Sequence, residues 1–182
     1  MVLVTVIVCG APLAVRAGDV VRSARREGWN VEVLATPSAM SWFEAKNYGG
    51  PNDVVPRSGS LPIGVPRAAV ARSAVIVVPM TFNSINKLAN GIADTYAHGV
   101  LCESLGAGLP LVIVPMVNGS LRGHPAWGKN MGCLRRAGVW IFDPATGKLC
   151  STWVDLSESM DIVDRFEPGR LMTIVKGLLA SE

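Results

Sequence analysis

The sequence predicts an α/β fold, an open parallel β-sheet with helices on both faces, and three observations carry this prediction. First, apolar runs of strand length alternate with amphipathic segments of helix length. Second, these runs are apolar throughout and rich in β-branched residues, which is typical of strands buried on both faces. Third, Gly, Pro and Asn fall between the segments, where the chain has to turn. A length of 182 residues suits one domain with a sizeable core.

The predicted elements follow in chain order. Residues 2–9 (VLVTVIVC) form the first strand, and residues 13–27 form an amphipathic helix that stops at Gly28. The segment NVEVLATPSA is a second strand with its turn. The remaining predictions are strands at 74–79, 110–115 and 138–143, helices at 39–46, 84–95, 97–107, 126–137 and 169–180, and a long surface loop at 47–66.

Composition excludes several classes of function. No apolar segment reaches the roughly 18–20 residues of a membrane span, and the apolar start looks like a buried strand rather than a signal peptide, so we expect a cytoplasmic protein. A dispersed net charge of +3 does not favour nucleic acid. Low charge with high apolarity predicts a homo-oligomer. No metal site is predicted, because the cysteines and histidines lack ligand spacing and read as reduced thiols and isolated imidazoles: Cys9, Cys102, Cys133, Cys150, His98 and His124.

Polar or flexible residues follow the first two strands. In CGAP, Gly10 allows close approach of the backbone, and the helix that follows offers free N–H groups to an anion. The absence of GxGxxG argues against a dinucleotide. In TPSA, the hydroxyls of Thr36 and Ser38 suit a phosphate. An ordinary helix cap is the alternative at each place.

Two further strand ends resemble the walls of one pocket. VVPMTFNSINKLANGIAD places Asn83, Ser84 and Asn86 at the start of a helix, and VPMVNGSLRGHPAWGKN again supplies Pro, Met, Asn and Gly after a buried strand. Ligands of open parallel sheets bind beyond the carboxyl ends of the strands. A bland alternative makes Ser84 a helix cap and Asn86 a solvated residue.

These two stretches resemble the signatures of the homo-oligomeric flavin-containing cysteine decarboxylases. The first is similar to PASANT-x-x-K-x-A-x-G-x-x-D, and the second to PxMNxxMW followed by N/H-P. The matching positions are Pro79, Asn83, Asn86, Lys87, Ala89, Asn90, Gly91 and Asp94 in the first, and Pro115, Asn118, Gly123, His124 and Pro125 in the second. The resemblance runs over nearly the whole chain and implies one Rossmann-like (flavodoxin-like) flavoprotein domain over residues 1–182.

The resemblance also implies FMN and its binding residues. Gly10, Pro12 and Ser38 would hold the ribityl phosphate. The isoalloxazine ring would be lined by Met80, Thr81, Phe82, Asn83 and Ser84. In family members, FMN oxidises a cysteine at Cβ to a thioaldehyde, which lets CO₂ leave and gives an enethiol. Asn118 is similar to the asparagine that binds the departing carboxylate.

The sequence departs from the family pattern at three places. The position of the family's catalytic histidine falls on Val65, the Met-Trp pair is Leu121-Arg122, and larger residues, Met80 and Phe82, replace two alanines. His124, six residues after Asn118, is the candidate replacement base, with packing in the H-P turn as the alternative.

Several functions remain open at this point. The first is decarboxylation of the C-terminal cysteine of a ribosomally made precursor peptide, by a trimer or a dodecamer, with residues 145–167 as a substrate-covering segment. Phosphopantothenoylcysteine decarboxylation is the second, since that branch has a cysteine at a place similar to Cys150, although Ser151-Thr152 replaces its G-D. A flavin prenyltransferase is less similar, because CGAP lacks its serine. A non-catalytic FMN-binding interaction protein is the last.

Overall fold

The computed structural model describes residues 2–42, 71–150 and 161–181. In these segments one sheet has the strand order β2-β1-β3-β4-β5-β6. Its strands are β1 (Leu3–Val8), β2 (Asn30–Ala35), β3 (Ala74–Met80), β4 (Leu111–Pro115), β5 (Trp140–Asp143) and β6 (Lys148–Leu149). All neighbours pair in parallel except β5 and β6, which are antiparallel. The predicted open parallel sheet is therefore confirmed, with a short antiparallel strand added at one edge.

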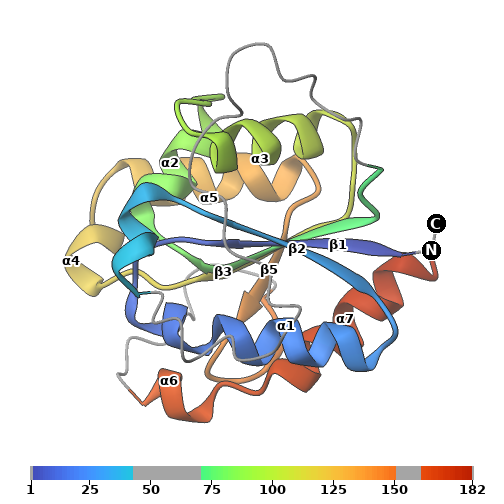
Figure 1. Cartoon of the computed structure of the whole chain (residues 1–182). Coiled ribbons are helices and arrows are strands. Elements are labelled where there is room, and N and C mark those ends of the chain that lie inside the picture. Colours follow the sequence, from blue (N-terminus) through green and yellow to red (C-terminus); the bar gives the residue numbers. More distant parts are fainter. Residues whose placement is uncertain (1, 43–70, 151–160, 182) are drawn as a thin grey trace.

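Helices cover both faces of this sheet (Figure 1). On one face lie α2 (Phe82–Ala89), α3 (Tyr96–Gly106) and α5 (Ala126–Arg136), and on the other lie α1 (Ala17–Arg26) and α7 (Pro168–Leu179). The shorter turns of helix are η1 (Pro12–Arg16), η2 (Pro37–Trp42), α4 (Gly119–Arg122) and α6 (Ile162–Arg165). None of the helices in the described segments has the length and apolar character needed to cross a bilayer.

Three of the predicted helices differ from the structure. The helix expected over 84–95 ends at Ala89, because Gly91 adopts a φ of 68°, a left-handed conformation that terminates a helix. The helix expected over 13–27 begins as the 3₁₀ turn η1 and becomes α-helical at Ala17. The predicted helix over 39–46 corresponds to η2 as far as Trp42. Its remainder, the predicted loop at 47–66 and Val65 lie outside the described residues.

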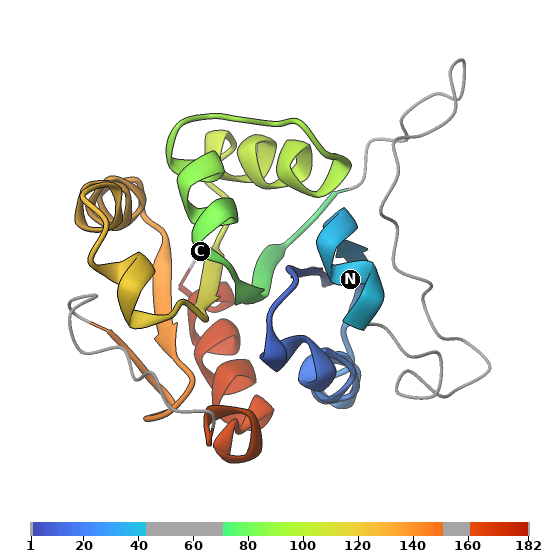
Figure 2. The same cartoon turned by 90° about the vertical axis from the view of Figure 1, so that its left-hand side faces the viewer.

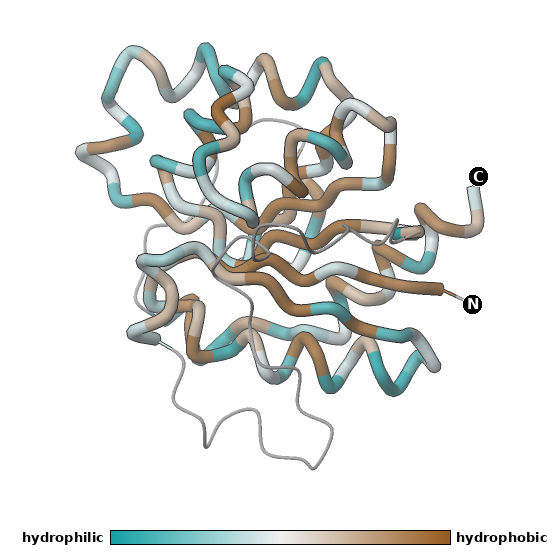
Figure 3. Tube along the Cα trace, turned by 45° about the horizontal axis from the view of Figure 1, so that its top comes forward, coloured by the Kyte–Doolittle hydropathy of each residue, from teal (hydrophilic) through white to brown (hydrophobic). Residues whose placement is uncertain are grey.

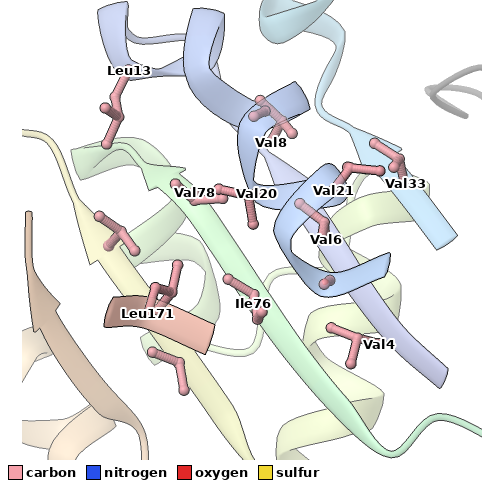
Figure 4. Packing of buried hydrophobic residues seen from close by; sticks show 14 of the residues in the cluster. Val4, Val6, Val8, Leu13, Val20, Val21, Val33, Ile76, Val78 and Leu171 are labelled. Carbon is pink, nitrogen blue, oxygen red and sulfur yellow. The ribbon is translucent and has the colours of Figure 1, made fainter. Parts of the chain in front are cut away.

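The alternation of side chains along each strand builds two cores. Val4, Val6 and Val8 of β1 point to the α1 and α7 face, where Val20 and Leu171 pack against them (Figure 4). Ile7 of β1 and Val75 and Val77 of β3 point the other way and join a second cluster under α2, α3 and α5. Figure 3 shows the result, hydrophobic strands in the middle and, outside them, helices along which hydrophobic and hydrophilic residues alternate. Burial on both faces explains why these strands are apolar throughout.

Candidate functional site

A pocket of about 620 Å³ lies where β1, β3 and β4 end. Figure 2 looks onto this edge, with η2, the start of α2 and α4 arranged around it. The order β2-β1-β3 makes the gap between β1 and β3 the point where chain connections diverge, which is where such sheets bind ligands. The described lining comprises Gly10, Ala11, Pro12, Ser38, Trp42, Thr81, Phe82, Asn83, Met116, Val117, Asn118, Leu121 and Ile162. Seven of the residues expected at the site are thus brought together: Gly10, Pro12, Ser38, Thr81, Phe82, Asn83 and Asn118.

One wall depends on the close approach of Gly10 to η2. A Cβ atom at position 10 would lie 2.5 Å from the carbonyl oxygen of Ser38, so no other residue fits without moving that backbone. Buried Thr36 fixes the same turn, because its N–H donates to the carbonyl of Val8 at 3.0 Å. The Oγ atoms of Thr36 and Ser38 lie 3.2 Å apart, which leaves the exposed Ser38 hydroxyl at the pocket.

The second wall is the start of α2. Thr81 is its N-cap, and its Oγ1 accepts the N–H of Ser84 at 3.4 Å. The N–H groups of Phe82 and Asn83 belong to the first turn of the helix and have no partner within it. Since both residues line the pocket, the positive end of the helix dipole faces the pocket.

The third wall holds Asn118, whose amide is oriented by the backbone. As the N-cap of α4, Asn118 accepts the N–H of Leu121 at its Oδ1 over 2.9 Å. This contact fixes the side chain with its oxygen engaged and leaves the Nδ2 hydrogens as donors. Met116, just before it, ties this wall to η1, because its Sδ accepts the N–H of Leu13 at 3.2 Å.

Three expected site residues lie elsewhere. Met80 and Ser84 are fully buried and outside the described lining of the pocket, since β3 ends one residue before the helix cap and turns both side chains into the core. His124 is exposed, and its ring meets that of Phe82 edge-on at 5.6 Å between centroids. Its Nδ1 accepts the N–H of Ala126 at 3.1 Å, so the imidazole caps the start of α5. Its catalytic role stays a prediction.

A buried polar network behind Thr81 was not expected from the sequence. His98, a residue of α3 that is only 2% exposed, places Nε2 3.0 Å from the Ser84 Oγ and Nδ1 2.7 Å from the Thr95 Oγ1. The Ser84 Oγ also accepts from the Cys9 thiol at 3.2 Å and from the Thr81 hydroxyl at 3.3 Å. Ser84 and His98 belong to different helices, so no periodicity in the sequence relates them.

Burial sets the charge state of the two titratable groups in this network. Burial lowers the pKa of the His98 imidazole, the ammonium of Lys87 lowers it further, and the carboxylate of Asp94 opposes both. Burial likewise raises the pKa of the Cys9 thiol, against weaker hydrogen bonds from Ser84 and Thr81 that lower it. At neutral pH both groups are uncharged, and Cys9 is a structural thiol rather than a nucleophile.

Cys150 lies away from the pocket. Its N–H donates to the carbonyl of Ile141 at 2.8 Å, and it lines a separate depression beside Trp140 and Leu149. Of the expected covering segment, residues 151–160 lie outside the described part of the chain. Among the described residues, no three His, Cys, Asp or Glu side chains gather where a metal ion would bind.

The pocket fits a flavin mononucleotide by size and by chemistry. Its volume lies in the range of small-molecule sites. Phe82, Trp42 and Met116 offer apolar surface to a flat ring, while Thr81 offers a polar group to its edge. The Ser38 hydroxyl and the turn at Gly10 suit a single phosphate at the other side of the pocket.

One family model and several known proteins are similar to this chain. The flavoprotein family model matches residues 2–167. A cysteine/cysteine sulfinic acid decarboxylase from an unknown prokaryotic organism is 37% identical over 76 residues, covering 42% of this chain and 20% of the relative. The coenzyme A biosynthesis bifunctional protein CoaBC of Bacillus subtilis (strain 168) is 32% identical over 133 residues, 70% of this chain and 32% of the relative. The chain thus spans a third or less of the length of these relatives.

A solved structure gives the same result for the fold. The FMN-dependent cysteine decarboxylase SpaF superimposes with a TM-score of 0.64 at 25% identity, covering 78% of this chain and 84% of that protein. The family match spans all the walls of the pocket, from Gly10 to Ile162. The chain therefore belongs to the flavoprotein family.

Proposed function

We propose that this protein is an FMN-dependent decarboxylase that acts on the C-terminal cysteine of a ribosomally made precursor peptide. The observation that carries the proposal is the orientation of Asn118, whose Oδ1 accepts the N–H of Leu121 and whose Nδ2 hydrogens remain as donors at the pocket. A carboxylate is the natural partner of such donors. The similarity to SpaF, described as an FMN-dependent cysteine decarboxylase, supports cysteine as the substrate residue.

Bound FMN supplies the two-electron oxidation of the cysteine at Cβ. The chain itself supplies orientation. Asn118 holds the substrate carboxylate in its ionised form, so that it can leave as neutral CO₂ while the electron pair of the broken C–C bond passes to the sulfur of the oxidised cysteine. Phe82 and Trp42 exclude water from the reacting carbon, which limits hydrolysis of the oxidised product.

A second candidate, phosphopantothenoylcysteine decarboxylation, is favoured by the 32% identity to CoaBC over 70% of the chain. The position of Cys150 instead favours a precursor peptide as the substrate. That cysteine lies beside Trp140 in a separate depression, and not with the residues that line the pocket.

Mass spectrometry of the reaction products tests the proposal. Purified protein is incubated with synthetic peptides that end in cysteine and, separately, with phosphopantothenoylcysteine. Loss of one CO₂ and two hydrogens from the peptide alone supports the first candidate. Loss of CO₂ alone from phosphopantothenoylcysteine, with the peptide unchanged, supports the second, because that reaction returns the two electrons to its product. A yellow protein that alters neither compound would instead be a non-catalytic FMN-binding protein. Chromatography of the heat-released cofactor should show FMN, and recovery of FAD would contradict the single-phosphate site.

We further propose that the protein is a homo-oligomer built from trimers, with the flavin site completed by a neighbouring chain. Large apolar side chains at the rim of the sheet support this, since Met40 and Leu121 near the pocket are 37% and 40% exposed. Light scattering at micromolar concentration should give a trimer or a dodecamer. A monomer would contradict the proposal.

A further inference from the structure

The Ser84 oxygen lies at the centre of the buried network and has three side-chain partners among the described residues. These are the Cys9 thiol at 3.2 Å, the Thr81 hydroxyl at 3.3 Å and the His98 Nε2 at 3.0 Å. Ser84 and His98 are 1% and 2% exposed, so water does not replace any of these partners. Of the three, only Thr81 also lines the pocket.

The capacity of a hydroxyl group fixes the direction of each bond. A hydroxyl has one hydrogen to donate and two lone pairs that accept. With the Cys9 S–H and the Thr81 O–H donating to it, Ser84 must donate its own hydrogen to the Nε2 of His98. The imidazole is then neutral and carries its proton on Nδ1, which lies 2.7 Å from the Thr95 Oγ1 and 3.6 Å from the Asp94 Oδ1.

This arrangement makes Thr81 an acceptor toward the pocket. Its hydrogen points inward to Ser84, and one lone pair of its Oγ1 accepts the Ser84 N–H at 3.4 Å. Because Thr81 lines the pocket, its remaining lone pair can accept a hydrogen bond from a ligand there.

Protonation of His98 reverses the arrangement. An Nε2–H group donates to the Ser84 oxygen, so Ser84 must donate its own hydrogen to another atom. The sulfur of Cys9 is a weak acceptor, which leaves the Oγ1 of Thr81. Thr81 then turns its hydrogen into the pocket and becomes a donor.

We propose that His98 is a positioning residue that sets the hydrogen-bond polarity of Thr81, and that neutral His98 selects a ligand group with an N–H or S–H facing Thr81. The inference deepens the proposed function and rests on flavin binding in this pocket. The donor belongs either to the flavin ring or to the substrate cysteine, and the test below separates these two sources.

The groups that face His98 favour its neutral form at physiological pH. The uncharged Cys9 thiol reaches the network from the residue after β1, and the Lys87 ammonium of α2 disfavours a second cation. Among the described residues that act on His98, only Asp94 favours the charged form. Lys87 and Asp94 themselves form an ion pair, with Nζ and Oδ2 2.6 Å apart, and this weakens the electrostatic stabilisation of a protonated imidazole by Asp94.

Nitrogen-15 NMR of the imidazoles tests the tautomer directly. The chain has only two histidines, so a His98→Gln variant assigns both spectra. At pH 7.5 we expect His98 to carry its proton on Nδ1, with and without FMN. A proton on Nε2 at that pH would overturn the inference, and this result does not depend on whether the protein is a decarboxylase.

Binding measurements test the effect on the pocket. The dissociation constant of FMN is measured by fluorescence from pH 8 to pH 5.5 for wild-type protein, His98→Gln and Ser84→Ala. The amide oxygen of His98→Gln still accepts from Ser84 but does not titrate. We expect wild-type protein to lose about twofold to tenfold in affinity, the value of one hydrogen bond, as His98 becomes protonated. We expect neither variant to show that loss.

Two controls remove other causes of a pH effect. Because the FMN phosphate itself titrates near pH 6, the measured effect is the difference between wild-type and variant proteins, and riboflavin serves as a phosphate-free probe. Ser104→Ala, which removes another buried hydroxyl from α3, should behave as wild type.

A second arm identifies the donor. If FMN alone shows no difference between wild-type protein and His98→Gln, the measurement is repeated for a cysteine-ending peptide bound to the FMN-loaded protein. A difference there assigns the donor to the substrate. Equal pH dependence of wild-type protein and His98→Gln in both arms would overturn the inference.

Discussion

Replacement of Asn118 by aspartate separates its role as the N-cap of α4 from its proposed role in binding the substrate carboxylate. Asp is as good an N-cap as Asn, so Asn118→Asp should still accept the N–H of Leu121 and leave α4 intact. The same change places a carboxylate where the substrate carboxylate binds. At about 4 Å and an effective dielectric constant near 20, the repulsion is about 4 kcal/mol, which corresponds to roughly a thousandfold loss of kcat/KM.

The assay compares kcat/KM for a cysteine-ending peptide with the FMN absorbance and the melting temperature of the same preparation. We expect kcat/KM to fall, and the FMN absorbance and the melting temperature to stay at wild-type values. Asn118→Ser is the matched control for charge, because serine also caps the helix but carries neither the amide donors nor a charge. Near-wild-type turnover by Asn118→Asp would refute the assignment of the carboxylate to this residue.

The remaining predictions concern the phosphate turn and the two histidines. Gly10→Ala should lower stability by about 1–3 kcal/mol and weaken FMN binding, because the added methyl group meets the Ser38 backbone, and calorimetry with FMN titration measures both. Gly177→Ala, where a methyl group meets nothing within 4 Å, is its control and should not be destabilised. His124→Ala should keep turnover within about tenfold of wild type, because its ring lies outside the described pocket lining, and a loss of 10²–10⁴ would instead identify a general base. The free energy of unfolding should fall as pH drops below about 6.5, because the pKa of His98 is lowered in the folded protein and the unfolded chain therefore binds the proton first. Denaturant titrations at several pH values measure this, and an equal dependence of the unfolding free energy on pH in wild-type protein and His98→Gln would contradict it.

Most of the fold was predictable from the sequence because its main signal is local. The continuous apolar runs of β1, β3 and β4 mark strands covered on both faces, and the structure confirms each of them. Strand β6 was missed because two residues, Lys148 and Leu149, carry no periodic pattern. The end of α2 was misplaced because the pattern of the sequence does not show that Gly91 takes a positive φ.

The site residues that follow strand ends were predictable from the sequence. Those brought together by the packing of one helix against another were not. Gly10, Ser38 and Asn118 follow buried strands, so the parallel sheet brings them to one edge. The pairing of Ser84 with His98 depends instead on how α2 packs against α3, a contact that spacing along the chain does not encode. For the same reason Ser84, expected to line the flavin ring, lies behind Thr81 in the structure.

A single anaerobic turnover tests the central claim most directly. FMN-loaded protein is mixed with a peptide that ends in cysteine, and the bleaching of the flavin absorbance is followed together with the CO₂ released. The account predicts one CO₂ for each FMN reduced, and no reaction with the same peptide as its C-terminal amide, which has no carboxylate for Asn118 to bind. Flavin reduction without CO₂ release, or an unchanged flavin in the presence of the free acid, would contradict it.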